Sequence, residues 1–471
     1  MDITAAIYTL VLYKLVLLGI GLWSQRRTRN TDDYFLGGRQ LGPVVAAISY
    51  GASSASAWTL LGMSGVAYVL GPAAIWIACG SVSGCAVAWL WIGPRLMRHT
   101  GERKQLTLTA FLAEDHRGER DRSIEITVSV IILISFIFYI AAQFQGAANT
   151  FSGAFNLPLA ESLLLGAAII TIYTFLGGFW AASLTDTLQG ILMLCAALLL
   201  PAFAFDAVGG WQGISAQAAQ ALGDVSMTAG NAGLAALGFV AGCIAVGIGT
   251  YGQPHLLNRF MALRDKRALR QAQFIAIGWM TLIFLGMFSL GVLGRFLIPE
   301  IENPETLFFE MSNLLLHPVV AAVLLAAVLS AIMSTADSML LVVASTVSHD
   351  LRLQALTPGR ELWVSRIAMV SVAVFAVIIA LSLPATIFER VLFAWIAIGS
   401  AFGPTVFAKL AGARPAHRAV RESVLTGFIL AVVLYLLPST PGDWAERIIP
   451  FCAASVVLLL RPSRLGRLVQ A

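Results

Sequence analysis

Long apolar runs separated by short polar or charged segments dominate the chain. A membrane-spanning helix needs about 20 apolar residues, and runs of that length recur along the whole sequence, so the pattern predicts about thirteen spanning helices. Their expected ranges are 5–23, 43–70, 72–97, 123–151, 157–179, 183–207, 233–253, 272–298, 318–347, 363–383, 387–410, 421–438 and 443–460. We therefore expect an all-α polytopic membrane protein in which residues 1–471 form a single membrane domain.

The composition agrees with a membrane protein, because 58% of the residues are hydrophobic and only 12% are charged, against roughly 25% charged in soluble chains. The first apolar run exceeds the length of a signal-peptide core and lacks a small-residue cleavage site, so we expect it to remain as a helix. The cysteines have no metal-type spacing and are expected to be small buried hydrophobes: Cys79, Cys85, Cys195, Cys243 and Cys452.

The basic residues indicate how the helices cross the membrane. Of the 30 Lys and Arg residues, 26 lie in alternate loops and in the C-terminal tail, at 24–42, 95–122, 178–182, 254–271, 348–366, 409–421 and from 461 onward. Lys and Arg concentrate in cytoplasmic loops, so we expect the N-terminus outside and the C-terminus in the cytoplasm. The basic residues that give the net charge of +5 are then topology signals, and no nucleic-acid partner is expected. Lys14, within the first span, is expected to snorkel or to form an ion pair.

Four polar residues stand close together near the middle of the apolar run at 321–341, namely Ser334, Thr335, Asp337 and Ser338. An ionisable group at that depth costs at least about 2.5–3.5 kcal/mol on insertion scales, so it normally faces the protein interior or a water-filled path. Hydroxyl oxygens are hard ligands that suit small hard cations, and the run therefore predicts an ion-binding site. The alternatives are that the hydroxyls bond to carbonyls one turn earlier, and that Asp337 serves an ion pair or a proton.

Two of the predicted spans contain residues that weaken a helix. They are 47–62, where Gly51 and several serines crowd the first half, and 242–254, which holds four glycines and ends at Pro254. They belong to the second and seventh spans, as the first helices of two inverted five-helix repeats would. Gaps in such helices free carbonyls for a cation and N–H groups for a carboxylate. The alternative is that small residues only permit close helix packing.

Short motifs distributed over nearly the whole chain resemble those of one family. They are DDYFLGGR at 32–39, GAS at 51–53 with Trp58, YTFLGGF at 173–179, TDT at 185–187, GQPH at 252–255, RFM at 259–261, MST at 333–335, Gly399, and AFGP at 401–404. On these residues the chain resembles the sodium:solute symporter family, and most closely its sodium/proline symporter branch. The resemblance implies a leucine-transporter-type (LeuT-type) core of two inverted five-helix repeats, at 43–207 and 233–410. An extra N-terminal helix at 5–23 would precede this core, and two C-terminal helices at 421–460 would follow it.

The resemblance also implies where sodium binds. Its ligands would be the backbone carbonyls of Ala52 and Ala55 with the hydroxyls of Ser334 and Thr335. In some members a second sodium site forms at positions that correspond here to Asp186 and Ser338. Asp186 also stands near an expected helix start, where an acidic residue caps free N–H groups, and this alternative stays open.

Departures from the proline branch concern both the ion and the solute. Ser54 stands where that branch has an aspartate, and we hypothesise that Asp337 restores the missing negative charge. In the broken sixth core helix Val246 replaces a Trp and Thr250 replaces a Tyr, which makes a pocket shaped for a pyrrolidine ring less favoured. The expected solute-binding residues are Ser54, Trp58, Tyr139, Val246, Thr250 and Gln253. Core packing is the alternative for the aromatic residues, and structural hydrogen bonding is the alternative for the glutamine.

These expectations converge on a sodium-coupled symporter in a bacterial inner membrane, which imports a small organic solute by alternating access. An amino acid such as proline is the leading candidate solute, and Na⁺ is the transported coupling ion. The alternatives are proton coupling to another amino acid or small carboxylate, and a transporter-like solute sensor. No enzyme is expected, since the sequence has no nucleophile–base set, metal-spaced His/Cys cluster or phosphate loop. The expected partners are the solute, sodium and membrane lipid, and the oligomeric state is left open.

Overall fold

The computed structural model describes residues 3–25, 36–155, 157–176, 179–222, 226–353, 361–383 and 386–460. Within these ranges the chain folds into helices and contains no β-strand. The α-helices are α1 (Ile3–Gln25), α3 (Pro43–Ser54), α4 (Met63–Leu70), α5 (Ile75–Val87), α6 (Gly93–Glu102), α7 (Leu108–Ala113), α8 (Arg122–Phe155), α9 (Leu159–Leu176), α10 (Phe179–Ala207), α11 (Gly210–Leu222), α12 (Gly233–Ala245), α13 (Pro254–Met261), α14 (Lys266–Leu297), α15 (Leu307–Leu315), α16 (Pro318–Ser345), α17 (Glu361–Ser382), α18 (Ile387–Leu410), α19 (His417–Tyr435) and α20 (Trp444–Leu460). Helical residues occupy each of the ranges expected to span the membrane. Motif residues 32–35 and 177–178 and the tail from 461 lie outside the described residues.

Eight helical stretches in the described part of the chain are long and apolar enough to cross a membrane. Two shorter apolar helices lie at Ile7–Ile20 and Leu159–Ile172. The longest stretch, Trp58–Glu102, contains one complete expected span and part of another, separated at Gly71, whose φ of +59° is a conformation that favours glycine. The all-α polytopic architecture is therefore confirmed, while the total of about thirteen spans stays a prediction.

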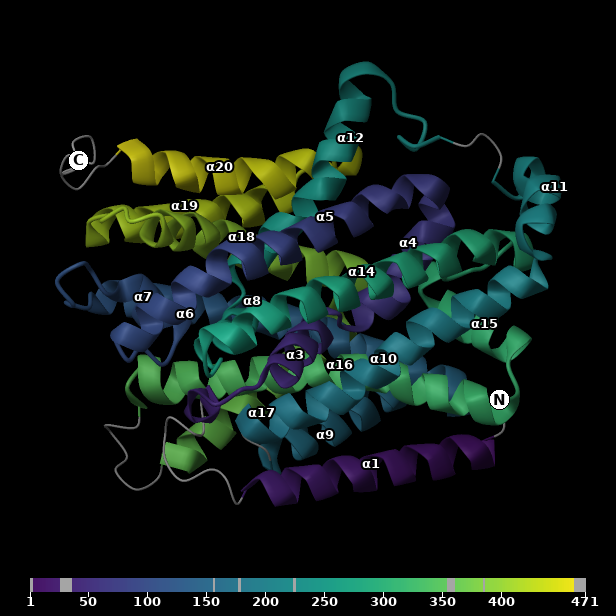
Figure 1. Cartoon of the computed structure of the whole chain (residues 1–471), viewed down its shortest axis with the longest axis horizontal. Coiled ribbons are helices and arrows are strands. Elements are labelled where there is room, and N and C mark those ends of the chain that lie inside the picture. The colour runs from purple at the N-terminus through teal and green to yellow at the C-terminus, as the bar shows by residue number, and fades with distance from the viewer. Residues whose placement is uncertain are drawn as a thin grey trace.

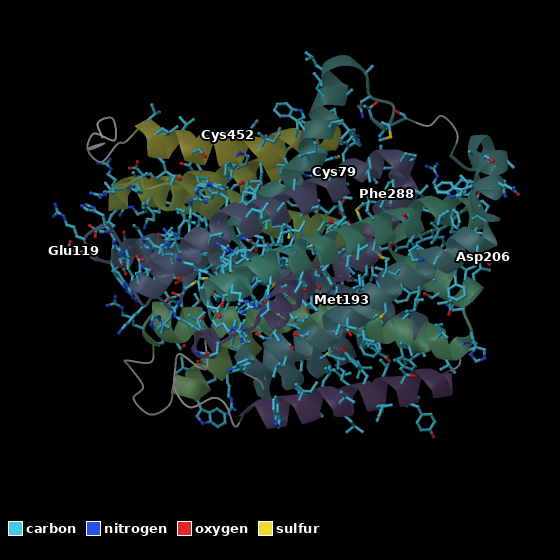
Figure 2. All side chains as sticks on the ribbon, viewed as in Figure 1. Cys79, Glu119, Met193, Asp206, Phe288 and Cys452 are labelled. Carbon is cyan, nitrogen blue, oxygen red and sulfur yellow. The ribbon has the colours of Figure 1, made fainter. Side chains whose placement is uncertain are left out.

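The helices form one bundle, and most of their axes run in the same general direction (Figure 1). One end of the bundle carries α11 and α15 and the other carries α6 and α7, and we call these the α15 end and the α7 end. Asp206 lies toward the α15 end and Glu119 toward the α7 end, with Met193 between them (Figure 2). α1 begins at the α15 end and runs along the outside of the bundle, in contact with α10 and α16.

α16 and α18 lie at the centre of this bundle. Every residue of α16 from 324 to 345 is buried, as is every residue of α18 from 390 to 406. A helix that is apolar on all sides is typical of such a position, because it meets protein on every face. The polar residues of α16 therefore face neighbouring helices, and the direction in which each one points decides what it can bind.

The expectation that all the cysteines are buried is wrong for three of them. Cys85 and Cys243 are buried, whereas Cys79, Cys195 and Cys452 are exposed on the bundle. The surface that a bundle turns to lipid is as apolar as its interior. An apolar run in the sequence therefore does not distinguish inward-facing from lipid-facing positions.

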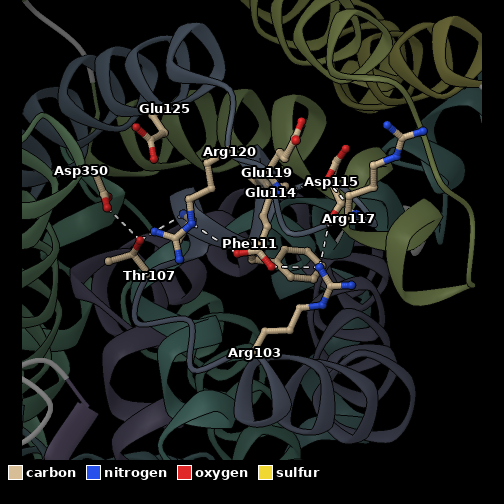
Figure 3. Close-up of polar contacts among 12 residues, drawn as sticks. Arg103, Thr107, Phe111, Glu114, Asp115, Arg117, Glu119, Arg120, Glu125 and Asp350 are labelled. Atoms are coloured by element: carbon tan, nitrogen blue, oxygen red, sulfur yellow. Dashed lines mark hydrogen bonds and ion pairs between the residues drawn. The ribbon is translucent and has the colours of Figure 1, made fainter.

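Polar contacts at the α7 end comprise an ion-pair cluster and a hydrogen bond that holds the end of the central helix. Glu114 pairs with Arg103 at 2.9 Å and with Arg120 at 3.2 Å (Figure 3). Burial raises the pKa of Glu114, but hydrogen bonds from its neighbours outweigh burial and hold the pKa below its ordinary value. Beside this cluster Thr107 donates a hydrogen bond to Asp350 at 2.8 Å (Figure 3). Asp350 ends the helical turn that continues α16, so α16 is tied to α7 at this point.

Candidate functional site

The first helix break follows α3 and frees backbone groups near the middle of the bundle. The backbone leaves the helix at Ala55, where φ is −86° and ψ is 72°. In an unbroken helix the N–H of Ala57 would donate to the carbonyl of Ser53, four residues earlier. Instead it donates to the side chain of Gln143 at 3.1 Å. The Ser53 carbonyl accepts the hydroxyl of Thr335 at 3.0 Å, which joins α3 to α16.

The helices that carry the residues expected to bind the first sodium ion are in contact near this break. α16 places the turn that contains Ser334 and Thr335 against α3, where Ala52 and Ala55 are fully buried. The Ser334 hydroxyl is buried and has no hydrogen-bond partner within the described ranges. Free hydroxyl lone pairs beside the carbonyls of a broken helix are the hard-oxygen environment that suits a small cation. The structure therefore brings Thr335 to the break in α3, and the role of the four residues as sodium ligands stays a prediction.

The second helix break separates α12 from α13. After α12 the chain forms a tight 3₁₀ turn, η5 (Val246–Gly252), and α13 starts at Pro254. This turn lies so close to α5 that a Cβ added at Gly84 would come within 2.6 Å of the Gly247 backbone. Glycine is required where two backbones approach this closely. The glycine-rich segment thus provides both a break and the close helix packing that we considered as its alternative.

A small cavity lies between the two breaks. It is lined by Ser54, Trp58, Val246 and Thr250, together with Ser81, Cys85, Met280, Phe284 and Trp395. Its volume is about 10 Å³, which is room for about one water molecule. Most of the residues expected to bind the solute therefore meet here. Because an amino acid needs more room than this, solute binding requires the lining helices to move apart.

Tyr139 and Gln253, the other two expected solute residues, both contact Trp395. The ring of Tyr139 is 6.3 Å from that of Trp395, measured between ring centroids. The Gln253 amide donates to the carbonyls of Gly249 and Trp395, each at 3.1 Å. The indole of Trp395 in turn donates to the carbonyl of Val246 at 3.0 Å. Gln253 thus supports the broken helix, as in the structural alternative, and Trp395 connects both residues to the cavity.

Aromatic side chains close the cavity at the α15 end. The ring of Trp58 lies 5.5 Å from that of Phe284 and 5.8 Å from that of Phe388. Phe388 is in the first turn of α18, and the carboxylate of Glu305 caps this turn from the segment before α15. It accepts the backbone N–H of Ile387 at 3.1 Å and that of Phe388 at 2.9 Å. Glu305 therefore holds the aromatic residue that covers Trp58.

The titration of Glu305 tests this capping contact. Burial raises the pKa of Glu305 above its ordinary value, and the two backbone N–H groups offset only part of that effect. The folded protein then holds the proton more tightly than the unfolded chain, so Glu305 favours folding most below the ordinary pKa of about 4.3 and progressively less as the pH rises through its folded-state pKa. We expect the wild type to gain stability relative to Glu305→Gln when thermal melts are compared at about pH 7 and about pH 5. A relative gain by the variant on acidification would contradict the raised pKa.

A buried arginine joins the residues expected to form the second sodium site. Arg259 of α13 pairs with Asp186 of α10 at 3.0 Å, and their side chains are 2% and 0% exposed. The same guanidinium donates to the hydroxyls of Ser53 at 3.0 Å and Ser338 at 2.6 Å. Asp186 also accepts the hydroxyl of Ser49 at 2.7 Å. Asp186 and Ser338 are therefore brought together, but they meet around the side chain of Arg259.

Asp186 lies inside α10 and not at its start. The expected span begins at residue 183, whereas α10 begins at Phe179. With 3.6 residues per turn, the carboxylate is about two turns from the free N–H groups of the helix end. The alternative that Asp186 caps the helix is therefore wrong, and its carboxylate faces α3 and α13 instead.

Asp337 points to a different side of α16 from the hydroxyls that meet α3. Thr335 and Ser338 both contact the α3 residue Ser53, and their spacing of three residues places them on one helix face. Asp337 instead accepts a hydrogen bond from Thr174 of α9. Its carboxylate is therefore directed away from the break in α3, where our hypothesis placed it as a substitute for the acid missing at Ser54.

Lys14 of α1 lies on the same side of α16 as Asp337. Its ammonium group contacts the sulfur of Met333, one helical turn before Asp337, so a positive charge lies near this carboxylate. Both charges lie within apolar helices, where each would be costly alone. This arrangement favours the ion-pair interpretation of both residues over a direct role of Asp337 in binding sodium.

A double-mutant cycle measures this pairing. Lys14→Met and Asp337→Asn should each destabilise the protein, because each leaves the other charge without its counter-charge in the membrane. The double variant should recover much of the loss, with a coupling energy of about 0.5–3 kcal/mol. Unfolding in detergent, followed for all four proteins, gives the result. Strictly additive losses would show that the two residues do not interact.

Three residues that the site uses were given no binding role from the sequence alone. Arg259 was counted with a cytoplasmic loop, although it is buried next to Asp186. Gln143 is an amide within an apolar span, which is a signal of function that the sequence offers. Trp395 carries no such signal, because an aromatic residue in an apolar run is the ordinary case.

The two broken helices, the cavity between them and the hydroxyls of α16 define a class of protein. Secondary transporters built on inverted repeats place their binding sites at paired discontinuous helices. The model of the sodium:solute symporter family matches residues 34–416. The chain belongs to the sodium:solute symporter family.

Relatives with assigned names match most of the chain. The high-affinity proline transporter PutP of Bacillus subtilis is 32% identical over 452 residues, which are 94% of each chain. The sodium/proline symporter of Salmonella typhimurium is 34% identical over 453 residues, which are 93% of this chain and 87% of that protein. The osmoregulated proline transporter OpuE of Bacillus subtilis is 35% identical over 419 residues, which are 86% of this chain and 83% of that protein.

Solved structures show the fold. A Na⁺-coupled sialic acid symporter in a substrate-bound, outward-open state matches with a TM-score of 0.79, at 16% identity and over 97% of both chains. A nucleobase-cation-symport-1 family transporter in a closed conformation matches with a TM-score of 0.58, at 12% identity and over 92% of this chain and 95% of that one. These likenesses confirm the LeuT-type fold. The boundaries of the two repeats, at 43–207 and 233–410, stay predictions.

Proposed function

We propose that this protein is a sodium-coupled symporter of proline or a closely related small amino acid. The contact that carries the proposal is the Thr335 hydroxyl on the Ser53 carbonyl, because the next residue, Ser54, lines the cavity. An ion bound at this point would therefore adjoin the solute. Relatives named as proline transporters and sodium/proline symporters support the choice of solute and ion. The proposed sodium ligands are the carbonyls of Ala52 and Ala55 and the hydroxyls of Ser334 and Thr335.

Sodium and solute would be coupled through the break after α3. A cation held by these oxygens replaces the hydrogen bond that Thr335 now donates, and it holds α3 against α16. The same break positions Ser54 and Trp58 in the cavity wall. Each ligand therefore favours the backbone geometry that binds the other. By linkage, sodium must tighten solute binding by the same factor as the solute tightens sodium binding.

Transport would open the cavity to each end of the bundle in turn. At the α15 end, access requires Phe388 to move away from Trp58, which it now covers. Toward the α7 end, release requires the buried pair of Arg259 and Asp186 to separate. These two closures lie on opposite sides of the helix breaks, as alternating access demands.

We propose that the protein lies in the cytoplasmic (inner) membrane with its α7 end in the cytoplasm. The concentration of 26 of the 30 basic residues in loops on one side supports this orientation. α1 begins at the α15 end (Figure 1), which would place the N-terminus outside. Lipid would surround the bundle, and the activity would be transport, as the names of the relatives suggest, and not enzymatic catalysis.

Thermal-shift titration of the purified protein tests the proposed pair of ligands. Sodium, potassium and steps of pH are each combined with proline and with other amino acids and short carboxylates. Stabilisation by proline only when sodium is present is the expected result. Sodium-dependent stabilisation by a different solute would keep the mechanism and replace the solute. Stabilisation by the solute that is the same with and without sodium but changes with pH would overturn sodium coupling.

A further inference from the structure

A wide cavity lies at the α7 end of the bundle, apart from the residues expected to bind sodium and the solute. Its volume is about 220 Å³, against about 10 Å³ for the cavity between the helix breaks. Its walls are the end of α6, the segments on either side of α7 and the end of α18, and Arg414 is exposed at its mouth. The lining is rich in groups that carry or can take a positive charge, namely His99, Arg103, His116, Lys409 and Arg414.

The acidic residues of this lining, Glu114 and Asp115, are already in use. Glu114 accepts hydrogen bonds from Arg103 at 2.9 Å and from Arg120 at 3.2 Å (Figure 3). Oδ1 of Asp115 accepts the backbone N–H groups of residues 117 and 119, at 2.8 Å and 3.0 Å, within its own loop. The two carboxylates and the two arginines together carry no net charge, so they cancel none of the remaining positive charge.

Lys409 and Arg414 supply that remaining positive charge. The Lys409 ammonium donates to three neutral backbone carbonyls at the end of α7, at 2.9, 2.7 and 2.7 Å, those of Phe111, Leu112 and Glu114. The Arg414 guanidinium forms no hydrogen bond or ion pair with the residues that the structure describes. The cavity is therefore a positively charged site without a counter-charge of its own.

We propose that this cavity binds a phosphate group, which belongs either to a lipid headgroup or to a soluble phosphate. A guanidinium binds phosphate through two parallel, charge-assisted hydrogen bonds, and Arg414 is free to do so. A phosphate monoester carries about 1.5–2 negative charges at pH 7, close to the two positive charges that Lys409 and Arg414 leave uncompensated. Drug-sized ligands occupy pockets of roughly 300–1,000 Å³, so this smaller cavity suits a phosphate with few attached atoms.

Aromatic and basic side chains place the cavity near the membrane boundary. The ring of Trp91 packs on that of Phe407 at 5.0 Å, and the Arg95 guanidinium lies 4.4 Å from the Trp91 ring. Such residues are typical of the membrane interface. Arg95 is one helical turn before His99, and Phe407 is two residues before Lys409. Basic pockets between membrane helices bind lipid head groups on the cytoplasmic side, and only the assignment to that side rests on the orientation proposed above.

A phosphate in this cavity would restrain α18. Lys409 already joins α18 to α7, and Thr107 joins α7 to Asp350, which ends the helical turn after α16. Arg414 follows α18, which also carries Trp395 in the wall of the solute cavity. A phosphate held between the turn after α18 and the loops beside α7 adds a further bridge. It opposes any movement of α18 that separates Lys409 from α7.

Thermal-shift titrations of the purified full-length protein test the proposal. Potassium phosphate is compared with potassium chloride at equal ionic strength, and dihexanoyl phosphatidylglycerol is compared with dihexanoyl phosphatidylcholine. We expect saturable stabilisation of the wild type by phosphate or by phosphatidylglycerol. Arg414→Gln should raise the half-saturating concentration by about 10-fold or more, as the loss of a hydrogen bond to a charged group does.

Arg418→Gln is the matched control, because Arg418 lies on α19 outside the cavity lining and pairs with Glu422 at 2.8 Å. This variant should respond as the wild type does. His116→Ala, which removes another exposed group of the lining, should weaken the response and gives a second reading if Arg414→Gln does not fold.

The two probes distinguish the two sources of the phosphate. Stabilisation by potassium phosphate identifies a soluble ligand, and stabilisation by phosphatidylglycerol alone identifies a lipid headgroup. No saturable stabilisation of the wild type by either probe would overturn the proposal, and so would an equal response of the wild type and the cavity variants. Because the titrations contain neither sodium nor proline, such a failure would leave the proposed sodium coupling untouched.

Discussion

Replacing Thr335 with valine is expected to raise the sodium concentration for half-maximal proline uptake by roughly 5- to 150-fold, the equivalent of about 1–3 kcal/mol. Valine keeps the branched shape but removes the hydroxyl that meets the Ser53 carbonyl at 3.0 Å. The proposed site then loses one of its two hydroxyl ligands, and a buried carbonyl loses its partner. Uptake into proteoliposomes, measured over a range of sodium concentrations at fixed proline, gives the change.

Ser330→Ala is the matched control for this variant. Ser330 is buried on the same helix, but its hydroxyl pairs with Tyr13 of α1 at 2.6 Å, away from the break in α3. Its removal should leave the sodium dependence unchanged, even if it lowers stability. If Thr335→Val showed the same sodium dependence as Ser330→Ala, the sodium site could not lie at Thr335.

Gly249→Ala is expected to abolish transport and to destabilise the protein by about 3 kcal/mol or more, at the upper end of overpacking costs. A Cβ at Gly249 would overlap the indole ring of Trp395. The indole cannot move aside easily, because it is buried and its N–H is bonded to the Val246 carbonyl at 3.0 Å. The added methyl group must therefore push η5 away from α18 and disturb the cavity between the breaks.

Gly278→Ala supplies the comparison for that substitution. Gly278 lies in α14, and a Cβ added there would meet no atom within 4 Å. Because alanine is favoured over glycine in a helix by up to about 1 kcal/mol, this variant should be as stable as the wild type or slightly more so. Melting temperature and proline uptake are measured for Gly249→Ala and for Gly278→Ala. Normal uptake by Gly249→Ala would show that the cavity does not need its present close contact with Trp395.

The run lengths and the loop charges of the sequence were sufficient to predict the helical architecture. The expected range 387–410 coincides with α18, and the range 43–70 contains the break at Ala55 that its serines and glycine predicted. The length of each apolar run follows directly from the thickness of the bilayer. Run lengths therefore predict where the helices lie. The same signal does not determine the number of spans, because Trp58–Glu102 forms one long helical stretch.

The direction of individual polar side chains was not predictable from the sequence. α16 is buried on all sides, so no periodic pattern shows that Thr335 faces α3 while Asp337 faces α9. The hydrogen-bond partner of Asp337 is Thr174 of α9, 163 residues earlier in the chain. Arg259 was similarly misplaced, because a basic residue just after a predicted span is usually a loop residue. Only tertiary packing decides these partners.

The most direct test of the account is proline uptake into proteoliposomes under an imposed sodium gradient. Purified protein is reconstituted, and labelled proline is followed with inward sodium, with potassium in place of sodium, and with an inward proton gradient alone. The account predicts that proline accumulates above its external concentration only with the sodium gradient, and that a sodium ionophore abolishes the accumulation. Accumulation driven by the proton gradient in the absence of sodium, or equal uptake in sodium and potassium, would contradict it.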